Sequence, residues 1–152
     1  MATEVERIRD QLRRAFAGEA WHGPSVLELL GDVDANRAAA RPIAGAHSIW
    51  ELTLHIAAWE KAAVRRLSGD RGELPDEENW PPVNDTSEAA WQQAIADLKN
   101  NNQQLQEAVA RVKENRLDEP IIEGMSSVYI TLHGAIQHDL YHAGQIAILK
   151  KT

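Results

Sequence analysis

The sequence predicts an all-α fold, a four-helix bundle with a short additional helix and a long crossover connection. In four long segments, apolar residues recur at the three- and four-residue spacing of one helix face. Residues that cap helices, such as serine, threonine and aspartate, stand at or near the start of each segment. No segment shows the strict apolar–polar alternation that a half-buried strand requires.

The first expected helix follows Thr3, which forms a capping-box pattern with Glu6. The apolar residues behind it recur at helical spacing, at Val5, Ile8, Leu12 and Phe16. They predict a helix to about Ala17. After a break at Gly23 and Pro24, the segment 25–31 predicts a short helix that ends at a glycine.

A second capping-box pattern, Ser48 with Glu51, precedes the next long helix, which we expect to end near Ser68. Its apolar stripe consists of Ile49, Leu52, Ile56, Trp59, Ala63 and Leu67. Residues 69–84 contain three prolines and several acidic residues, which predict a long exposed loop. This connection is long enough for a crossover along the bundle.

The third long helix is expected to begin at Asp85 or Thr86 and to reach about Lys113. Residues 115–120 form a break. Ser126 or Ser127 then caps the last helix, which should extend from Val128 to about Lys150.

Composition limits the possible functions. The 152 residues suit one domain over residues 1–152, and 43% apolar with 26% charged residues is typical of globular proteins. The net charge is −7 and the sixteen Lys and Arg residues are scattered, so we expect no nucleic-acid partner. No apolar run approaches the ~20 residues of a membrane span or resembles a signal peptide. We therefore expect a cytoplasmic protein without a membrane partner.

The chain has no cysteine, which excludes disulfides, thiolate metal sites and a cysteine nucleophile. Any thiol chemistry would require a small-molecule thiol. Histidine is therefore the residue type to examine as a metal ligand.

His138 and His142 are four residues apart on a predicted helix, so their Cβ atoms are ~6 Å apart on one face and both imidazoles can reach one ion. His55 lies in an apolar part of the second long helix. Because bundle cores build metal sites from facing helices, we predict His55, His138 and His142 as ligands. The alternative is that His55 is a core residue hydrogen-bonded to a neighbour.

The other three histidines, His22, His47 and His133, are expected to be solvated or locally hydrogen-bonded. Gly134 and Gly144 interrupt the last helix, where glycine costs ~1 kcal/mol relative to alanine. Close helix packing is the simpler explanation for both. Space for a substrate is the alternative for Gly134, which faces the same way as His138.

Asp139 is a candidate catalytic residue. It stands in "HDLYH" where the H-E-x-x-H motif of zinc proteases has its general base. Aspartate is one methylene shorter, and the third ligand here lies upstream on another helix, which argues against a protease. Asp139 could orient water or a proton, although a solvated helix carboxylate is the simpler interpretation.

Several residues could surround the ligands. Glu51, Gln145 and Tyr141 are candidate partners for the outer nitrogen atoms of the histidines, because metal-bound imidazoles usually donate their second N–H. Three tryptophans could line a pocket or belong to the core: Trp50, Trp59 and Trp80.

Two stretches, "GAHSIWELTLHIAAWE" (45–60) and "LHGAIQHDLYHAGQIAILKK" (132–151), resemble the DinB-like family, also called YfiT-like metalloenzymes. The order of these motifs agrees along nearly the whole chain. The resemblance implies a four-helix bundle, usually a homodimer, with zinc or nickel held by three histidines and completed by water. His55, His138 and His142 fall on those ligand positions.

Characterised members of that family include S-transferases that use thiols such as bacillithiol or mycothiol, and a thiol-dependent isomerase. The expectation for this chain is therefore a metal-dependent transferase that joins a low-molecular-weight thiol to a small-molecule substrate. A metal-dependent hydrolase and a non-catalytic metal-binding or interaction module are the alternatives.

Overall fold

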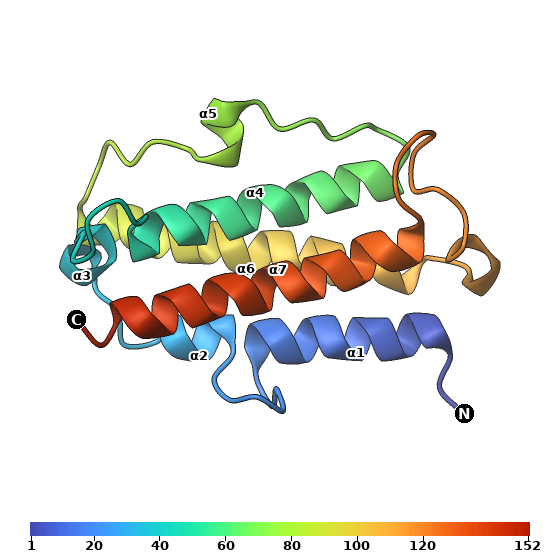
Figure 1. The fold of residues 1–152 in the computed structure, drawn as a ribbon, viewed down its shortest axis with the longest axis horizontal. Coiled ribbons are helices and arrows are strands. Elements are labelled where there is room, and N and C mark those ends of the chain that lie inside the picture. The colour runs from blue at the N-terminus through green and yellow to red at the C-terminus, as the bar shows by residue number, and fades with distance from the viewer.

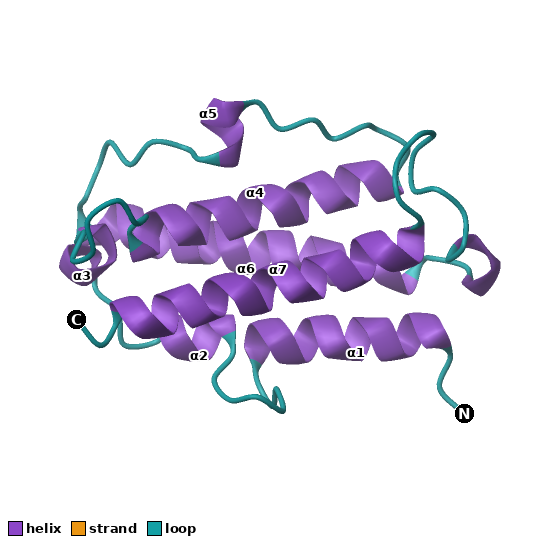
Figure 2. Ribbon diagram, viewed as in Figure 1, coloured by secondary structure: helices purple, strands orange, loops and turns teal.

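The computed structural model describes all 152 residues, and it is all-helical (Figure 2). Four long helices form the bundle: α1 (Glu4–Ala17), α4 (Ile49–Leu67), α6 (Glu88–Ala110) and α7 (Val128–Leu149). The short helices are α2 (Val26–Leu30), α3 (Ala35–Ala39), α5 (Asp76–Asn79) and a 3₁₀ turn at Glu114–Arg116. The predicted all-α, four-helix fold is confirmed.

The helices of the bundle are joined by one crossover connection. α4 and α6 run in the same direction, and α1 and α7 run in the opposite direction (Figure 1). The connection between α4 and α6 therefore returns along the length of the bundle, and it carries α5. Each of α1 and α4 packs against both α6 and α7.

The caps explain where the long helices begin. Both predicted capping boxes are formed, Thr3 with Glu6 and Ser48 with Glu51. Ser127 caps α7, as expected. α6 instead begins after Ser87, because Ser87 accepts a hydrogen bond from the Ala90 amide, while Asp85 accepts one from the Ser87 amide.

Two short helices were not expected, α3 and α5. A helix of four or five residues has no room for a repeating apolar stripe, so periodicity does not reveal it. The prediction of a plain exposed loop over 69–84 is wrong in its middle, where α5 and Trp80 pack against α4. α6 ends earlier than expected, at Ala110, whereas α7 ends at Leu149, in agreement with the predicted end near Lys150.

Two apolar clusters fill the bundle, one at each end. The cluster near α2 and α3 contains Trp50 and Trp91, whose rings are 5.2 Å apart. The other cluster joins α1 to the first half of α7 through residues such as Leu12 and Leu132. Along α7, the segment 137–142 lies between the residues of the two clusters. Of its polar residues, His138, Asp139 and His142 are partly or fully buried in the middle of the bundle, whereas Gln137 and Tyr141 are exposed.

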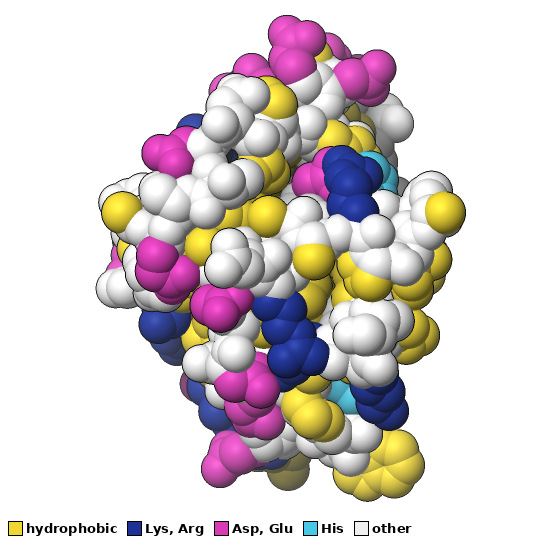
Figure 3. Space-filling view, turned by 90° about the vertical axis from the view of Figure 1, so that its left-hand side faces the viewer, with side chains coloured by type: hydrophobic (Ala, Val, Ile, Leu, Met, Phe, Trp, Pro, Cys, Tyr) yellow, Lys and Arg dark blue, Asp and Glu magenta, His cyan; other side chains and the backbone are white.

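Charged side chains are spread over the surface. On the face drawn in Figure 3, Lys and Arg side chains are interspersed with acidic and apolar ones and form no continuous basic patch. None of the helices combines the length and apolar character that crossing a membrane would require.

Candidate metal centre

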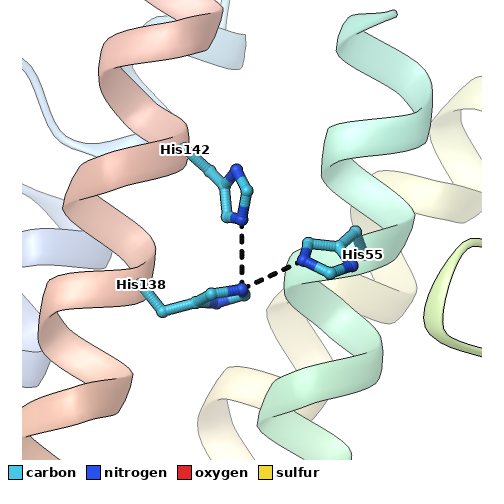
Figure 4. Close-up of side chains that lie close together, drawn as sticks. All are labelled: His55, His138 and His142. Carbon is cyan, nitrogen blue, oxygen red and sulfur yellow. Dashed lines mark hydrogen bonds between the residues drawn. The ribbon is translucent and has the colours of Figure 1, made fainter. Parts of the chain in front are cut away.

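His55, His138 and His142 meet in the middle of the bundle, His55 from α4 and the other two from successive turns of α7 (Figure 4). Nε2 of His138 lies 3.1 Å from Nε2 of His55 and 3.1 Å from Nε2 of His142. One nitrogen from each of the three rings can serve as a ligand, and these three nitrogens lie within 4.8 Å of one another. This histidine cluster is thus compact enough for one ion to contact every ring.

Hydrogen-bond partners of the outer nitrogens set the tautomer of two of the rings. Nδ1 of His55 is 2.8 Å from the backbone oxygen of Asn79, and Nδ1 of His142 is 2.6 Å from Oε1 of Gln145. Both partners are acceptors, so each Nδ1 donates its hydrogen. In the neutral rings, both Nε2 atoms then present a lone pair to the centre of the cluster.

His138 cannot satisfy both lone pairs, because its single Nε2 has at most one hydrogen to donate. At least one inward lone pair is therefore left without a donor among the three rings. A divalent cation accepts all of these lone pairs at once, so the donor set fits a metal ion of the kind that imidazole binds.

The surroundings keep the rings neutral, which is the form that binds metal. Burial lowers the pKa of His55 and of His142. For His138, burial, together with charge on its two neighbours, lowers the pKa to about 3. Near neutral pH, none of the three rings takes up a proton that would compete with an ion.

The segment around α5 covers His55. The Trp80 ring is stacked between His55 and His47, with ring centroids 3.8 Å and 3.6 Å away and the planes nearly parallel. The side chain of Asn79 accepts a hydrogen bond from the indole of Trp59. Residues 79–80 therefore fix the orientation of His55, a role that the sequence analysis missed because it treated this segment as an exposed loop.

The other histidines stay outside the cluster. His22 is exposed, as expected. His47 lies against Trp80 and is 3.6 Å from a carboxylate oxygen of Glu51. His133 differs from the expectation of a solvated or hydrogen-bonded ring, since its Nε2 is buried and has no partner.

Of the three candidate partners for the ligand rings, only Gln145 makes the expected hydrogen bond. Glu51 is engaged by the cap of α4 and by Arg41, which leaves it no role at the cluster. Tyr141 is 68% exposed and places its ring edge-on to His142, 5.2 Å away.

A pocket of about 350 Å³ lies beside His138, between α4 and α7. Its lining consists of Trp59, Glu60, Ala63, Arg66, Ser126, Ile130, Thr131, Gly134, Ala135, His138 and Asp139. Of the three tryptophans considered above, Trp59 borders this pocket, whereas Trp50 belongs to the core.

Asp139 is buried in the wall of this pocket, only 2% exposed, so the expectation of a solvated helix carboxylate is wrong. Glu60, which the sequence analysis did not single out, is buried as well and accepts a hydrogen bond from Asn102. Burial raises the pKa of Asp139 to about 8. Burial, and then the nearby charge of Asp139, raise the pKa of Glu60 well above its usual value.

The two helix glycines are not explained by close packing. A Cβ atom added to Gly134 or to Gly144 would meet no neighbouring atom within 4 Å, so the packing interpretation is wrong for both. Gly134 instead borders the pocket, consistent with the alternative of space beside His138. Gly144 is exposed.

Comparison with known proteins agrees with this geometry. The family model described as the DinB superfamily matches residues 20–146, a range that includes all three histidines of the cluster and the whole pocket lining. Searches of curated proteins and of solved structures found no significant match. The match covers most of the chain, and the chain therefore belongs to the DinB superfamily.

Proposed function

We propose that His55, His138 and His142 bind one divalent metal ion, zinc or nickel, and that the protein transfers a low-molecular-weight thiol to an electrophilic small molecule. The observation that carries the proposal is the inward direction of the Nε2 lone pairs, which Asn79 and Gln145 set by accepting from the outer nitrogens. The adjoining pocket offers a place for a substrate next to His138.

The set of ligands supports a reactive rather than a purely structural ion. Three neutral imidazoles add no negative charge. Glu51 and Gln145, which lie within a turn of the histidines and could supply a fourth ligand, are engaged in other hydrogen bonds. An ion bound there would favour the ionised form of a thiol or water beside it. The chain itself holds the three rings in place, covers His55 with Trp80 and leaves space at Gly134.

The proposed transfer is a nucleophilic substitution or addition. A sulfur electron pair of the thiolate forms a bond to an electrophilic carbon. In a substitution, the bond from that carbon to the leaving group breaks and its electron pair departs with the leaving group. The thiol proton passes to solvent, or to the product in an addition. The sulfur must come from a small molecule because the chain contains no cysteine.

The first test is metal content after purification without chelators or nickel resin, measured by elemental mass spectrometry. We expect about one equivalent in the wild type. We expect none in a variant combining His138→Ala with His142→Ala. His22→Ala, which changes an exposed histidine, serves as the control and should keep its metal. Absence of metal in the wild type, even after zinc or nickel is added, would refute the proposal.

The second test distinguishes thiol transfer from hydrolysis. Thiol consumption with an alkylating electrophile is measured for loaded and chelator-treated protein, and the proposal requires metal-dependent consumption. Hydrolysis is the second candidate, because Asp139 is a buried carboxyl next to His138. Burial raises its pKa to about 8, so only a minor fraction of it is ionised at pH 7 and could accept a proton from water.

A third candidate, a non-catalytic module in which the ion joins α4 to α7, predicts a different result. Metal would raise the melting temperature, but neither thiol consumption nor ester hydrolysis would depend on it.

A further inference from the structure

The pocket beside His138, called the groove below, is lined mainly by two antiparallel helices, α4 and α7 (Figure 1). Glu60 and Asp139 line it together with His138, and Arg66 lines it six residues farther along α4. At 1.5 Å per residue, Glu60 and Arg66 are ~9 Å apart along α4. The groove therefore has one end at the histidine cluster and the other near Arg66.

The inner end of this groove contains two carboxyl oxygens without partners. Glu60 is 3% exposed and Asp139 is 2% exposed, and both line the groove. Oε2 of Glu60 and Oδ2 of Asp139 have no hydrogen-bond donor. Leaving a buried polar oxygen unpaired is unfavourable, so both carboxyls would gain from an additional hydrogen-bond partner.

Three of the donor side chains that line the groove are already engaged with other parts of the chain. The Thr131 hydroxyl donates to the backbone of α7's first turn, and the Trp59 indole donates to Asn79. The guanidinium of Arg66 donates to backbone oxygens of the loop that follows α4 and lies over the Trp59 ring, 5.4 Å from its centroid. None of these groups reaches the two free carboxyl oxygens.

We propose that this groove is the subsite for one reactant, and that it binds a small amine by placing the ammonium group between Glu60 and Asp139. The apolar residues Ala63, Ile130 and Ala135 would contact the alkyl part of the ligand. An ammonium group suits this position because it supplies several hydrogen-bond donors to the free oxygens, and because its positive charge favours the ionised form of both carboxyls. The inference rests on the proposed function only in assigning the amine as a reactant; the binding itself does not require the metal.

The test is isothermal titration calorimetry with three probes of similar length, hexylamine, hexan-1-ol and hexanoate, on zinc-loaded and chelator-treated protein. We expect hexylamine to bind at least tenfold more tightly than either other probe in both preparations. Glu60→Gln should weaken hexylamine binding at least tenfold, because the amide retains an oxygen for Asn102 but cannot ionise to balance the ammonium charge.

A steric pair of variants provides an independent check. Gly134→Leu should abolish hexylamine binding, since its side chain would project into the groove from a position with no neighbour within 4 Å. Gly144→Leu, on the same helix but exposed and outside the groove, should bind hexylamine like the wild type. This pair decides the question if circular dichroism shows that Glu60→Gln does not fold.

The inference is overturned if hexan-1-ol or hexanoate binds as tightly as hexylamine, or if folded Glu60→Gln retains wild-type affinity. The two carboxyls would then only share a proton with each other. Hexylamine binding without zinc binding would refute the proposed function alone, whereas zinc binding without hexylamine binding would refute the subsite alone.

Discussion

The histidine cluster and the carboxyl pair Glu60–Asp139 both lie between α4 and α7, yet they differ in the hydrogen-bond partners that the chain supplies. In the cluster, the outer nitrogens of His55 and His142 have partners from the chain itself. In the pair, one oxygen of each residue has none. The chain thus supplies partners for the outer nitrogens of the cluster, whereas it leaves one oxygen of each carboxyl without a partner.

The neighbours of each group account for the difference. His55 is covered by Asn79 and Trp80, which the crossover brings over α4, and Gln145 follows His142 by one turn of α7. Glu60 and Asp139 face the groove, where the only partner supplied by the chain is Asn102. Preorganisation of a polar group in a helical bundle therefore depends on which segment covers it.

The largest effect expected is the loss of a ring from the cluster. His55→Ala should lower zinc affinity by more than 100-fold, because two imidazoles remain and nothing replaces the third ligand. Competition with a chromophoric chelator measures this change. His22→Ala, which alters an exposed histidine, should leave the affinity unchanged.

Removal of an orienting partner should have a smaller effect on the same measurement. Gln145→Ala is expected to lower zinc affinity 10- to 100-fold, since Nδ1 of His142 would lose the acceptor that sets its tautomer. Gln137→Ala, an exposed position on the same helix, is the matched control. Equal affinities for the two variants would contradict the orienting role.

The carboxyl pair should destabilise the metal-free protein as pH rises. The native pKa of Asp139 is about 8 and its usual value is 3.8, so the native state holds a proton that the unfolded state releases. The resulting stability is present below pH 3.8 and is lost as pH increases toward 8. Asp139→Asn should therefore gain stability relative to the wild type between pH 5 and 8, on the order of 3 kcal/mol.

Urea unfolding of both proteins at pH 5 and pH 8 measures this gain. A difference between variant and wild type that does not change with pH would show that Asp139 ionises as easily in the native state as in the unfolded chain.

The histidine cluster should respond to pH in the opposite direction. The native pKa of His138 is about 3 against an ordinary value of 6.5, so the unfolded state binds the proton more readily. Stability of the metal-free protein should be lost as pH falls from 6.5 toward 3. The slope of the unfolding free energy with pH counts the protons taken up on unfolding, and His138→Gln should reduce that number by up to one in this range. His22→Gln should leave the slope unchanged.

The smallest effect is expected at Tyr141, whose hydroxyl makes no hydrogen bond to His142 and whose side chain is largely exposed. Tyr141→Phe should change zinc affinity by less than about twofold, because it removes no partner of a ligand ring. A larger decrease, measured by the same chelator competition, would assign the hydroxyl a place in the hydrogen bonding of the cluster.

The long helices and the spacing of the histidines follow from the amino-acid sequence alone. Capping boxes at Thr3 and Ser48 and the periodic apolar residues act within one turn or two of a helix, so they can be read without knowing the fold. The four-residue spacing of His138 and His142 likewise places both rings on one face of α7.

The burial of the polar groups and their hydrogen-bond partners depend on how the helices pack against one another. Asn79 is 24 residues from His55, and Glu60 and Asp139 come from different long helices. Their sequence neighbours do not distinguish a buried carboxyl from a solvated one, since Asp139 lies on a helix that has both buried and exposed residues. Burial and pairing are set by segments that meet only when the bundle closes, and this is why the histidine spacing was predictable while the carboxyl pair was not.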